Sequence, residues 1–222
     1  MPARVIALLL GLLLSGCGSA MLGHDPGALV EGSGPVIREE RPVSGVSAVE
    51  FGAFGNLEII QGDEEGLTLQ AQGDILPMIA SEVDGDTLRI YAKGNVSPKL
   101  GIQMRLKVRS LRSIMAGGSG NITVMGLSGD TLSVRVIGAN AVTVAGSVRE
   151  QTVSLTGAGT YDGGALESQR ATVTIDGFAD ALVRVSEQLR TSISGPGTVE
   201  YFGEPRLIDD NTGLGQVMRR TR

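Results

Sequence analysis

The sequence predicts an all-β protein, a single-stranded β-solenoid with coils of about 20 residues and a β-rich N-terminal half. The first observation is a glycine that recurs every 18 to 20 residues, at Gly118, Gly138, Gly157, Gly177 and Gly195. The second is that 41% of residues are hydrophobic but only 3% are aromatic, with no Trp. Thin stacked layers of Val, Ile, Leu and Ala suit this composition. The length of 222 residues is consistent with one folded unit.

Residues 1–16 are predicted to be a lipoprotein signal peptide. Arg4 gives a positive start, and the apolar run from Val5 to Leu14 is too short to cross a bilayer as a helix. The Leu-Ser-Gly-Cys sequence that ends at Cys17 matches the bacterial lipobox, and Cys17 is the only cysteine of the chain. We therefore predict that Cys17 is lipidated and attaches the protein to a membrane. The alternatives are an ordinary signal peptide with an incidental cysteine and a soluble protein with a buried start.

The residue after the lipobox cysteine indicates the destination. Aspartate at that position is the usual signal for retention at the inner membrane, whereas this chain has Gly18. In a bacterium with two membranes, the expected location is therefore the outer membrane, on its periplasmic or cell-surface face. A lipobox cysteine receives three acyl chains, enough for stable anchoring.

Residues 17–37 are predicted to be a flexible tether, because they are rich in small and polar residues and have no hydrophobic periodicity. His24, the only histidine, lies in this segment. Metal binding and base catalysis both need rigid neighbouring groups, and none is expected here. His24 is therefore interpreted as a solvated linker residue.

The first half of the folded part alternates short strand patterns with turns. The expected strands are Val46–Phe51, Leu57–Gln61, Leu67–Ala71, Thr87–Ala92 and Gln103–Val108. The acidic runs 63–65 and 84–86 lie at the turns and lack the ligand spacing of a calcium loop. We therefore expect both runs to be tips of hairpins.

The second half contains the repeats, which align on their glycines. The residues four positions before each glycine are predicted to face inward: Ile114, Val134, Val153, Val173 and Thr191. The same is predicted for the residues two positions before: Ala116, Val136, Leu155, Ile175 and Ile193. A second strand follows each glycine, so the glycines mark corners between strands. Around Gly55 a weaker version occurs, with Phe51 four positions before and Ile59 four after.

Large residues and a proline at 201–205 are expected to close the last coil. Residues 206–222 are expected to be a poorly ordered tail. The corner glycines are not interpreted as a phosphate-binding loop, because no helix-forming segment follows them.

The chain resembles the bacterial family of putative auto-transporter adhesins with a head GIN domain. The resemblance rests on the opening Val46-Ser-Ala-Val-Glu-Phe51, the Gly-Ser-Gly type corners, and the ending from Ile193 to Pro205. It covers residues 38–205. It implies a right-handed β-helix-like fold in an exported protein of unknown function, and brings no catalytic residues to carry over.

Three functions follow from these features. The first is a binding or adhesion module for a polysaccharide or an envelope protein. The second is a structural or signalling lipoprotein without catalytic activity. The third, an enzyme acting on polysaccharides, is least favoured, because the repeats carry no recurring carboxylate pair. No catalytic, cofactor-binding or metal-binding residue is predicted. Nucleic acid is excluded as a partner, because the net charge is −5 and the only lysines are Lys93, Lys99 and Lys107.

Overall fold

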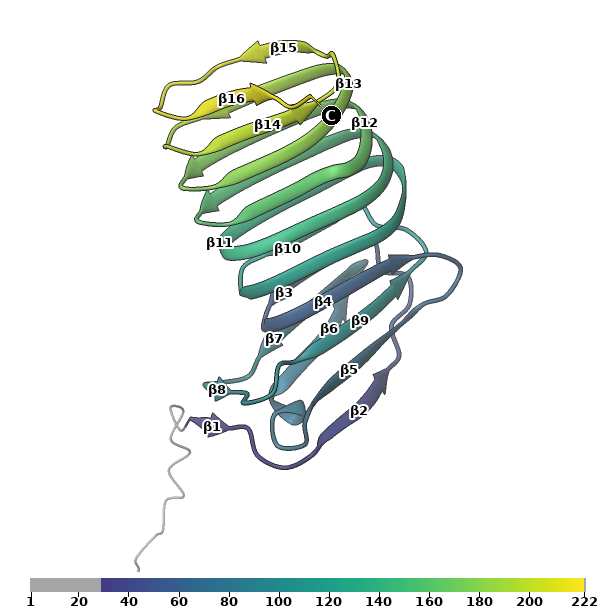
Figure 1. Ribbon diagram of the computed structural model, residues 1–222. Coiled ribbons are helices and arrows are strands. Elements are labelled where there is room, and N and C mark those ends of the chain that lie inside the picture. Colours follow the sequence, from purple (N-terminus) through teal and green to yellow (C-terminus); the bar gives the residue numbers. More distant parts are fainter. Residues whose placement is uncertain (1–28, 222) are drawn as a thin grey trace, which may run out of the picture.

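The computed structural model describes residues 29–221. These residues form sixteen β-strands and one 3₁₀ turn, η1 (Leu76–Met78), with no α-helix among them. No helix in this part of the chain is long and apolar enough to cross a membrane. The prediction of an all-β protein is confirmed at this level. Fourteen strands form one large sheet that curls around a common core, and β1 and β8 form a separate parallel pair (Figure 1).

The N-terminal half is a mixed sheet. Its strands are β1 (Val30–Glu31), β2 (Val36–Arg41), β3 (Ala48–Gly52), β4 (Phe54–Gln61), β5 (Gly66–Gln72), β6 (Ile79–Asp84), β7 (Thr87–Ala92), β8 (Val96–Ser97) and β9 (Gln103–Val108). Strand β5 pairs antiparallel with both β2 and β9, and β6 pairs antiparallel with β7. The pairs β3–β7 and β4–β9 are parallel. All five strands expected in this region are present.

The C-terminal half contains only parallel pairs. Its strands are β10 (Ser113–Ala116), β11 (Ser119–Gly157), β12 (Thr160–Gly177), β13 (Asp180–Ile193), β14 (Thr198–Phe202), β15 (Arg206–Asp209) and β16 (Gln216–Arg219). Strands β11 to β13 bend sharply, so that each contributes to more than one side of the stack (Figure 1). Ile114 pairs with Val134, and Val153 pairs with Val173. Equivalent residues of successive repeats therefore lie side by side.

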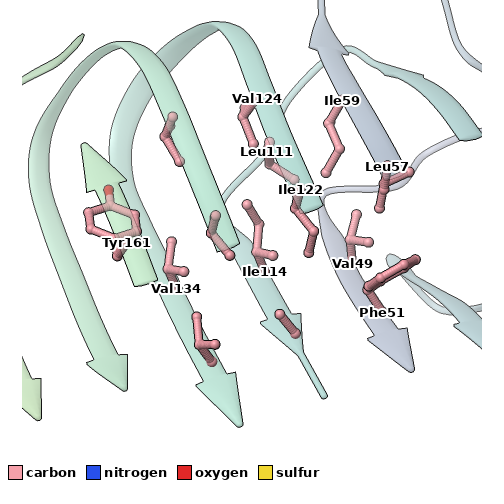
Figure 2. Close-up of a cluster of buried hydrophobic side chains, with 14 of the residues drawn as sticks. Val49, Phe51, Leu57, Ile59, Leu111, Ile114, Ile122, Val124, Val134 and Tyr161 are labelled. Atoms are coloured by element: carbon pink, nitrogen blue, oxygen red, sulfur yellow. The ribbon is translucent and has the colours of Figure 1, made fainter. Parts of the chain in front are cut away.

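The predicted inward positions form the core. All five residues four positions before a corner glycine are at most 1% exposed, and so are all five residues two positions before. Figure 2 shows this interior, in which aliphatic side chains from neighbouring strands meet together with Phe51 and Tyr161. Burial of these aliphatic side chains, each of which contributes about 1.5–3 kcal/mol, supplies the main stabilisation.

The corner glycines are required for two different physical reasons. Gly177 has a positive φ of 136°, which side chains rarely adopt. Gly118 has no such φ, but an added Cβ would overlap the carbonyl oxygen of Ala53 in the neighbouring strand. The repeat of glycine therefore reflects close backbone contact between strands as much as turn geometry.

Two expectations for the first half were wrong in detail. Gly55 pairs with Gly120 and not with Gly118, so the alignment was displaced by two residues. A shift of two keeps every side chain on the same face, which is why the inward residues were still identified. Residues 63–65 do not form a hairpin tip, because β9 lies between β4 and β5. The 84–86 turn does join a hairpin, β6–β7.

The expectation of a poorly ordered tail after residue 205 was also wrong. Strand β15 pairs with β13, and β16 pairs with β14. Gly213 follows Gly195 by 18 residues and continues the repeat. The hydrophobic pattern is missing because Asp209 and Asn211 occupy the two inward positions, and Asp209 accepts a 2.7 Å hydrogen bond from Thr191 Oγ1. The last repeat, with β15 and β16, is therefore a polar end on the apolar stack of strands.

Candidate binding face

Cys17 and His24 lie outside the described residues, so lipidation of Cys17 stays a prediction. Among residues 29–221, no group of three or more His, Cys, Asp or Glu side chains is arranged to hold a metal ion. The feature that stands out within these residues is a polar surface on the outer side of β5, β9, β4 and the start of β11.

A row of amide side chains crosses these strands. Gln70 pairs with Gln103, Gln103 with Asn56, and Asn56 with Asn121, so all four side chains lie side by side on the outer face. Successive side chains of a strand point to opposite faces, and the next residues along the strands, Leu57, Met104 and Ile122, are buried. The amide side chains therefore point outward. We call these four residues the amide row.

Hydrogen bonds connect three members of the amide row. Asn121 Nδ2 donates to Asn56 Oδ1 at 2.9 Å, and Asn56 Nδ2 donates to Gln103 Oε1 at 3.3 Å. An amide has two donor hydrogens and two acceptor lone pairs on its oxygen. Each linked amide therefore keeps donors or acceptors for another molecule while its orientation is fixed by its neighbours.

A second row runs beside the first, two residues further along β9, β4 and β11 and two residues earlier along β5, which runs antiparallel to β9. It contains Thr68, Arg105, Glu58 and Thr123. Arg105 Nε donates to Glu58 Oε2, forming an ion pair in which the Arg105 side chain is 58% exposed. The guanidinium group still has donors directed to solvent, because only its Nε is used in this pair.

The two rows line a shallow trough of about 620 Å³. Arg38 of β2 stands at one end, and Thr143 of β11 at the other. From Gln70 to Asn121 the amide row crosses four strands, a distance of about 15 Å. No Phe, Tyr or Trp lines the trough. It can therefore bind a polar group by many hydrogen bonds, but it offers no aromatic side chain for a sugar ring to stack on.

A second hollow of similar volume lies over the bends of β11, β12 and β13, lined by Arg149, Glu167, Ser168 and Arg184. Beneath it is a buried polar chain. Tyr161 donates from its hydroxyl to Gln151 Oε1 at 2.9 Å, and Gln151 Nε2 donates to Ser168 Oγ at 2.8 Å.

Burial raises the pKa of the Tyr161 phenol, with a smaller contribution from the charge of Asp162. The phenol is therefore held neutral as a hydrogen-bond donor. Ser168 Oγ in turn donates to the Arg184 carbonyl oxygen at 2.7 Å. The buried polar groups of Tyr161, Gln151 and Ser168 therefore bond to one another and to the backbone, which fits a structural role.

Two members of the amide row share a local feature of the sequence. Asn56 and Asn121 each directly follow a glycine with positive φ, Gly55 and Gly120. Gln103 could not be added from the sequence, because β9 is inserted between β4 and β5 and pairs with β4 across 47 residues. Only the three-dimensional pairing brings the four amides together.

Comparison with known proteins gives one family match and several structural matches. Among proteins with curated descriptions, none matches the chain. A crystal structure described as a putative adhesin from Bacteroides fragilis has a TM-score of 0.70 at 18% identity, covering 86% of this chain and 100% of that one. A putative adhesin from Parabacteroides distasonis gives 0.57 at 16% identity, with 87% and 100% covered. A protein described as a putative lipid binding protein, from the same species, gives 0.55 at 17% identity, with 87% and 100% covered.

These identities are low, so the structural matches establish the fold alone. The family model described as "putative auto-transporter adhesin, head GIN domain" matches residues 47–205, which is more than half of the chain. The resemblance noted in the sequence is therefore confirmed, and the chain belongs to the putative auto-transporter adhesin, head GIN domain family.

Proposed function

We propose that this protein is a lipid-anchored binding module of the bacterial cell envelope, and that its trough binds a neutral polysaccharide. The observation that carries the proposal is the amide row with its fixed, incompletely used donors and acceptors. Sugar hydroxyl groups both donate and accept, and they match amide groups well. The adhesin description of the family supports a binding role and not a catalytic one.

The fold we infer for the parallel part is a single-stranded right-handed β-helix with coils of about 20 residues. Its support is the pairing of residues that are 18 to 20 positions apart, as in Ile175 with Ile193 and Val153 with Val173. A helical stack of this kind provides long outer faces on which side chains repeat at strand spacing, about 4.8 Å. An extended polymer fits such a face.

Anchoring depends on Cys17. Radiolabelled palmitate should enter the wild-type protein in a bacterium with a lipoprotein pathway and should be absent from Cys17→Ser. The wild type should also fractionate with the outer membrane, as Gly18 after the cysteine predicts. Equal labelling of the two proteins would rule out the anchor.

Binding can be tested separately with the full chain. We expect retention on an array of neutral envelope glycans, and a loss of at least tenfold in affinity for Asn56→Ala/Asn121→Ala, about 1.4 kcal/mol. The matched control is Thr152→Ala/Thr174→Ala, which removes two exposed polar side chains from strands on another side of the stack. Equal affinity of the two double variants would refute the proposal that the glycan binds in the trough. Recovery of a specific envelope protein with no glycan would favour the scaffold function.

A further inference from the structure

One edge of the molecule carries a row of exposed apolar residues. The position directly after the corner glycine is apolar in the last five coils: Ala139, Ala158, Phe178, Pro196 and Leu214. Phe178 is 78% exposed and Leu214 is 88% exposed, the two highest values for large hydrophobic side chains in the described part of the chain. A row of apolar residues that includes such exposed large side chains indicates a surface that something covers.

The row is continuous because the corners stack directly on one another. An added Cβ at Gly195 would overlap the carbonyl oxygen of Gly177, and one at Gly213 would lie 2.6 Å from that of Gly195. Phe178, Pro196 and Leu214 therefore follow one another at about 4.8 Å per coil. In Figure 1 the corners between β12 and β13 and between β13 and β14 lie on the same side of the stack.

The same edge continues to the start of the described chain. The corner glycine Gly118 lies against Ala53, and Gly55, two residues after Ala53, lies against the carbonyl of Ile102. Leu100, 51% exposed, precedes Ile102 by two residues and therefore lies next to this corner. The backbone N–H of Leu100 donates to Gln72 Oε1 at 3.0 Å, and Gly32 lies against that same amide. Leu29, 57% exposed, precedes Gly32 by three residues. Accordingly, β1 pairs with β8 on the side where the corners lie (Figure 1).

We propose that this edge, consisting of Leu29, Leu100, Phe178, Pro196 and Leu214 and called the corner edge, lies on the surface of a lipid bilayer. The inference rests on the proposed lipidation of Cys17. Cys17 precedes Leu29 by twelve residues, which span at most about 40 Å when fully extended. The lipid would therefore hold the corner edge close to the bilayer, where Phe and Leu side chains enter the interface.

Charge defines the kind of bilayer. Asp176 and Asp180 lie two residues on either side of Phe178. Of the large apolar residues of the corner edge, only Leu100 has a cationic neighbour in the sequence, Lys99. Anionic headgroups would be repelled around Phe178 at short range. The corner edge is therefore suited to a zwitterionic surface. In this orientation the amide row, in which Asn56 and Asn121 directly follow Gly55 and Gly120, runs beside the membrane and not away from it.

Fluorescence offers a direct test, because the chain has no Trp. The lipidated full chain carrying Phe178→Trp is reconstituted on phosphatidylcholine vesicles. The control is Met125→Trp, which is also exposed but lies seven residues beyond Gly118, about 23 Å along the strand. We expect Trp emission at shorter wavelength and quenching by brominated lipids for the Phe178 variant, with neither effect for the control.

The outcomes separate this inference from the anchor itself. If the protein floats with the vesicles but the Phe178→Trp emission stays solvent-like, the corner edge is not on the bilayer and the inference is overturned. If the protein does not float, the lipid anchor has failed, and this inference fails with it. Emission that shifts with protein concentration before vesicles are added would show that a second copy covers the edge, which also overturns it. Stronger quenching on vesicles with phosphatidylglycerol would contradict the charge argument.

Discussion

At the scale of single residues, Tyr161 is the departure from the repeat that most needs explanation. It occupies a position where the other coils have Ile122, Val142, Ala181 and Val199, yet it is only 2% exposed. Gly163 makes this possible, because a Cβ there would lie 2.7 Å from the Tyr161 ring. The glycine that interrupts the third repeat is therefore a response to the large side chain two residues earlier.

Replacing Tyr161 with Phe should lower the free energy of unfolding by about 1–3 kcal/mol, because Gln151 Oε1 would be left buried without its donor. Urea denaturation measures the change. The control is Tyr91→Phe, since the Tyr91 hydroxyl donates to Glu82 at the surface and its removal should matter little. A Tyr161→Phe protein as stable as the wild type would show that the buried polar chain contributes nothing.

Tyr161 also predicts a pH dependence. Its pKa is raised above the ordinary value of 10.0 in the folded state, so above pH 10 the unfolded chain releases this proton while the folded chain keeps it. The stabilising contribution is complete below pH 10 and falls at higher pH, by up to about 1.4 kcal/mol per pH unit. Tyr161→Phe should reduce this slope when unfolding is measured between pH 9 and 11. An identical slope in both proteins would contradict the argument.

At the scale of elements, the path of β11 depends on the absence of one methyl group. Gly146 has a φ of 143°, and a Cβ there would overlap the carbonyl oxygen of Leu127 in the neighbouring coil. Gly146→Ala should therefore cost about 3 kcal/mol, from backbone strain and overpacking together. Gly129→Ala is the control, because a Cβ at Gly129 meets nothing within 4 Å. Comparable thermal midpoints for the two variants would refute the close backbone contact between Gly146 and Leu127.

The strands of the repeat were predictable because two simple rules coincide in them. Side chains alternate along a strand, and glycine marks each corner, so inward residues such as Val153 and Ile175 follow from counting. The last coil could not be identified in the same way, because Asp209 and Asn211 stand where hydrophobic residues were required. A repeat that ends the stack of strands faces water on one side, and this difference removes the hydrophobic signal.

The binding face was less predictable than the core. Asn56 and Asn121 share only a preceding glycine in the sequence, and nothing there links Gln103 to them. Their association depends on the order β5-β9-β4-β11, which brings a later strand between two earlier ones. Sheet order of this kind is decided by long-range pairing and not by local periodicity.

At the scale of the whole molecule, the two ends of the sheet are protected differently. At the N-terminal end, Arg41 covers the start of β6 by donating to the carbonyl oxygen of Ile79 at 2.7 Å and to Ser81 Oγ at 3.0 Å. At the C-terminal end, Arg219 and Arg220 of the last coil form ion pairs with Glu204 and Glu200. Charged groups at exposed strand edges oppose end-to-end pairing of molecules.

This arrangement predicts the effect of removing the last coil. A chain ending at Pro205 loses β15 and β16 and exposes the core residues Leu189 and Val199, which are now fully buried. The loss should be at least about 2 kcal/mol, which for a protein of this size lowers the thermal midpoint by about 4–8 °C. Deleting only residues 221–222 is the matched control and should leave the midpoint unchanged. The shortened chain should also self-associate in sedimentation experiments, because its new edge lacks Arg219, Arg220 and the polar inward residues. A monomeric shortened chain with the wild-type midpoint would mean that the stack is already complete at Pro205, and that the last coil does not act as its cap.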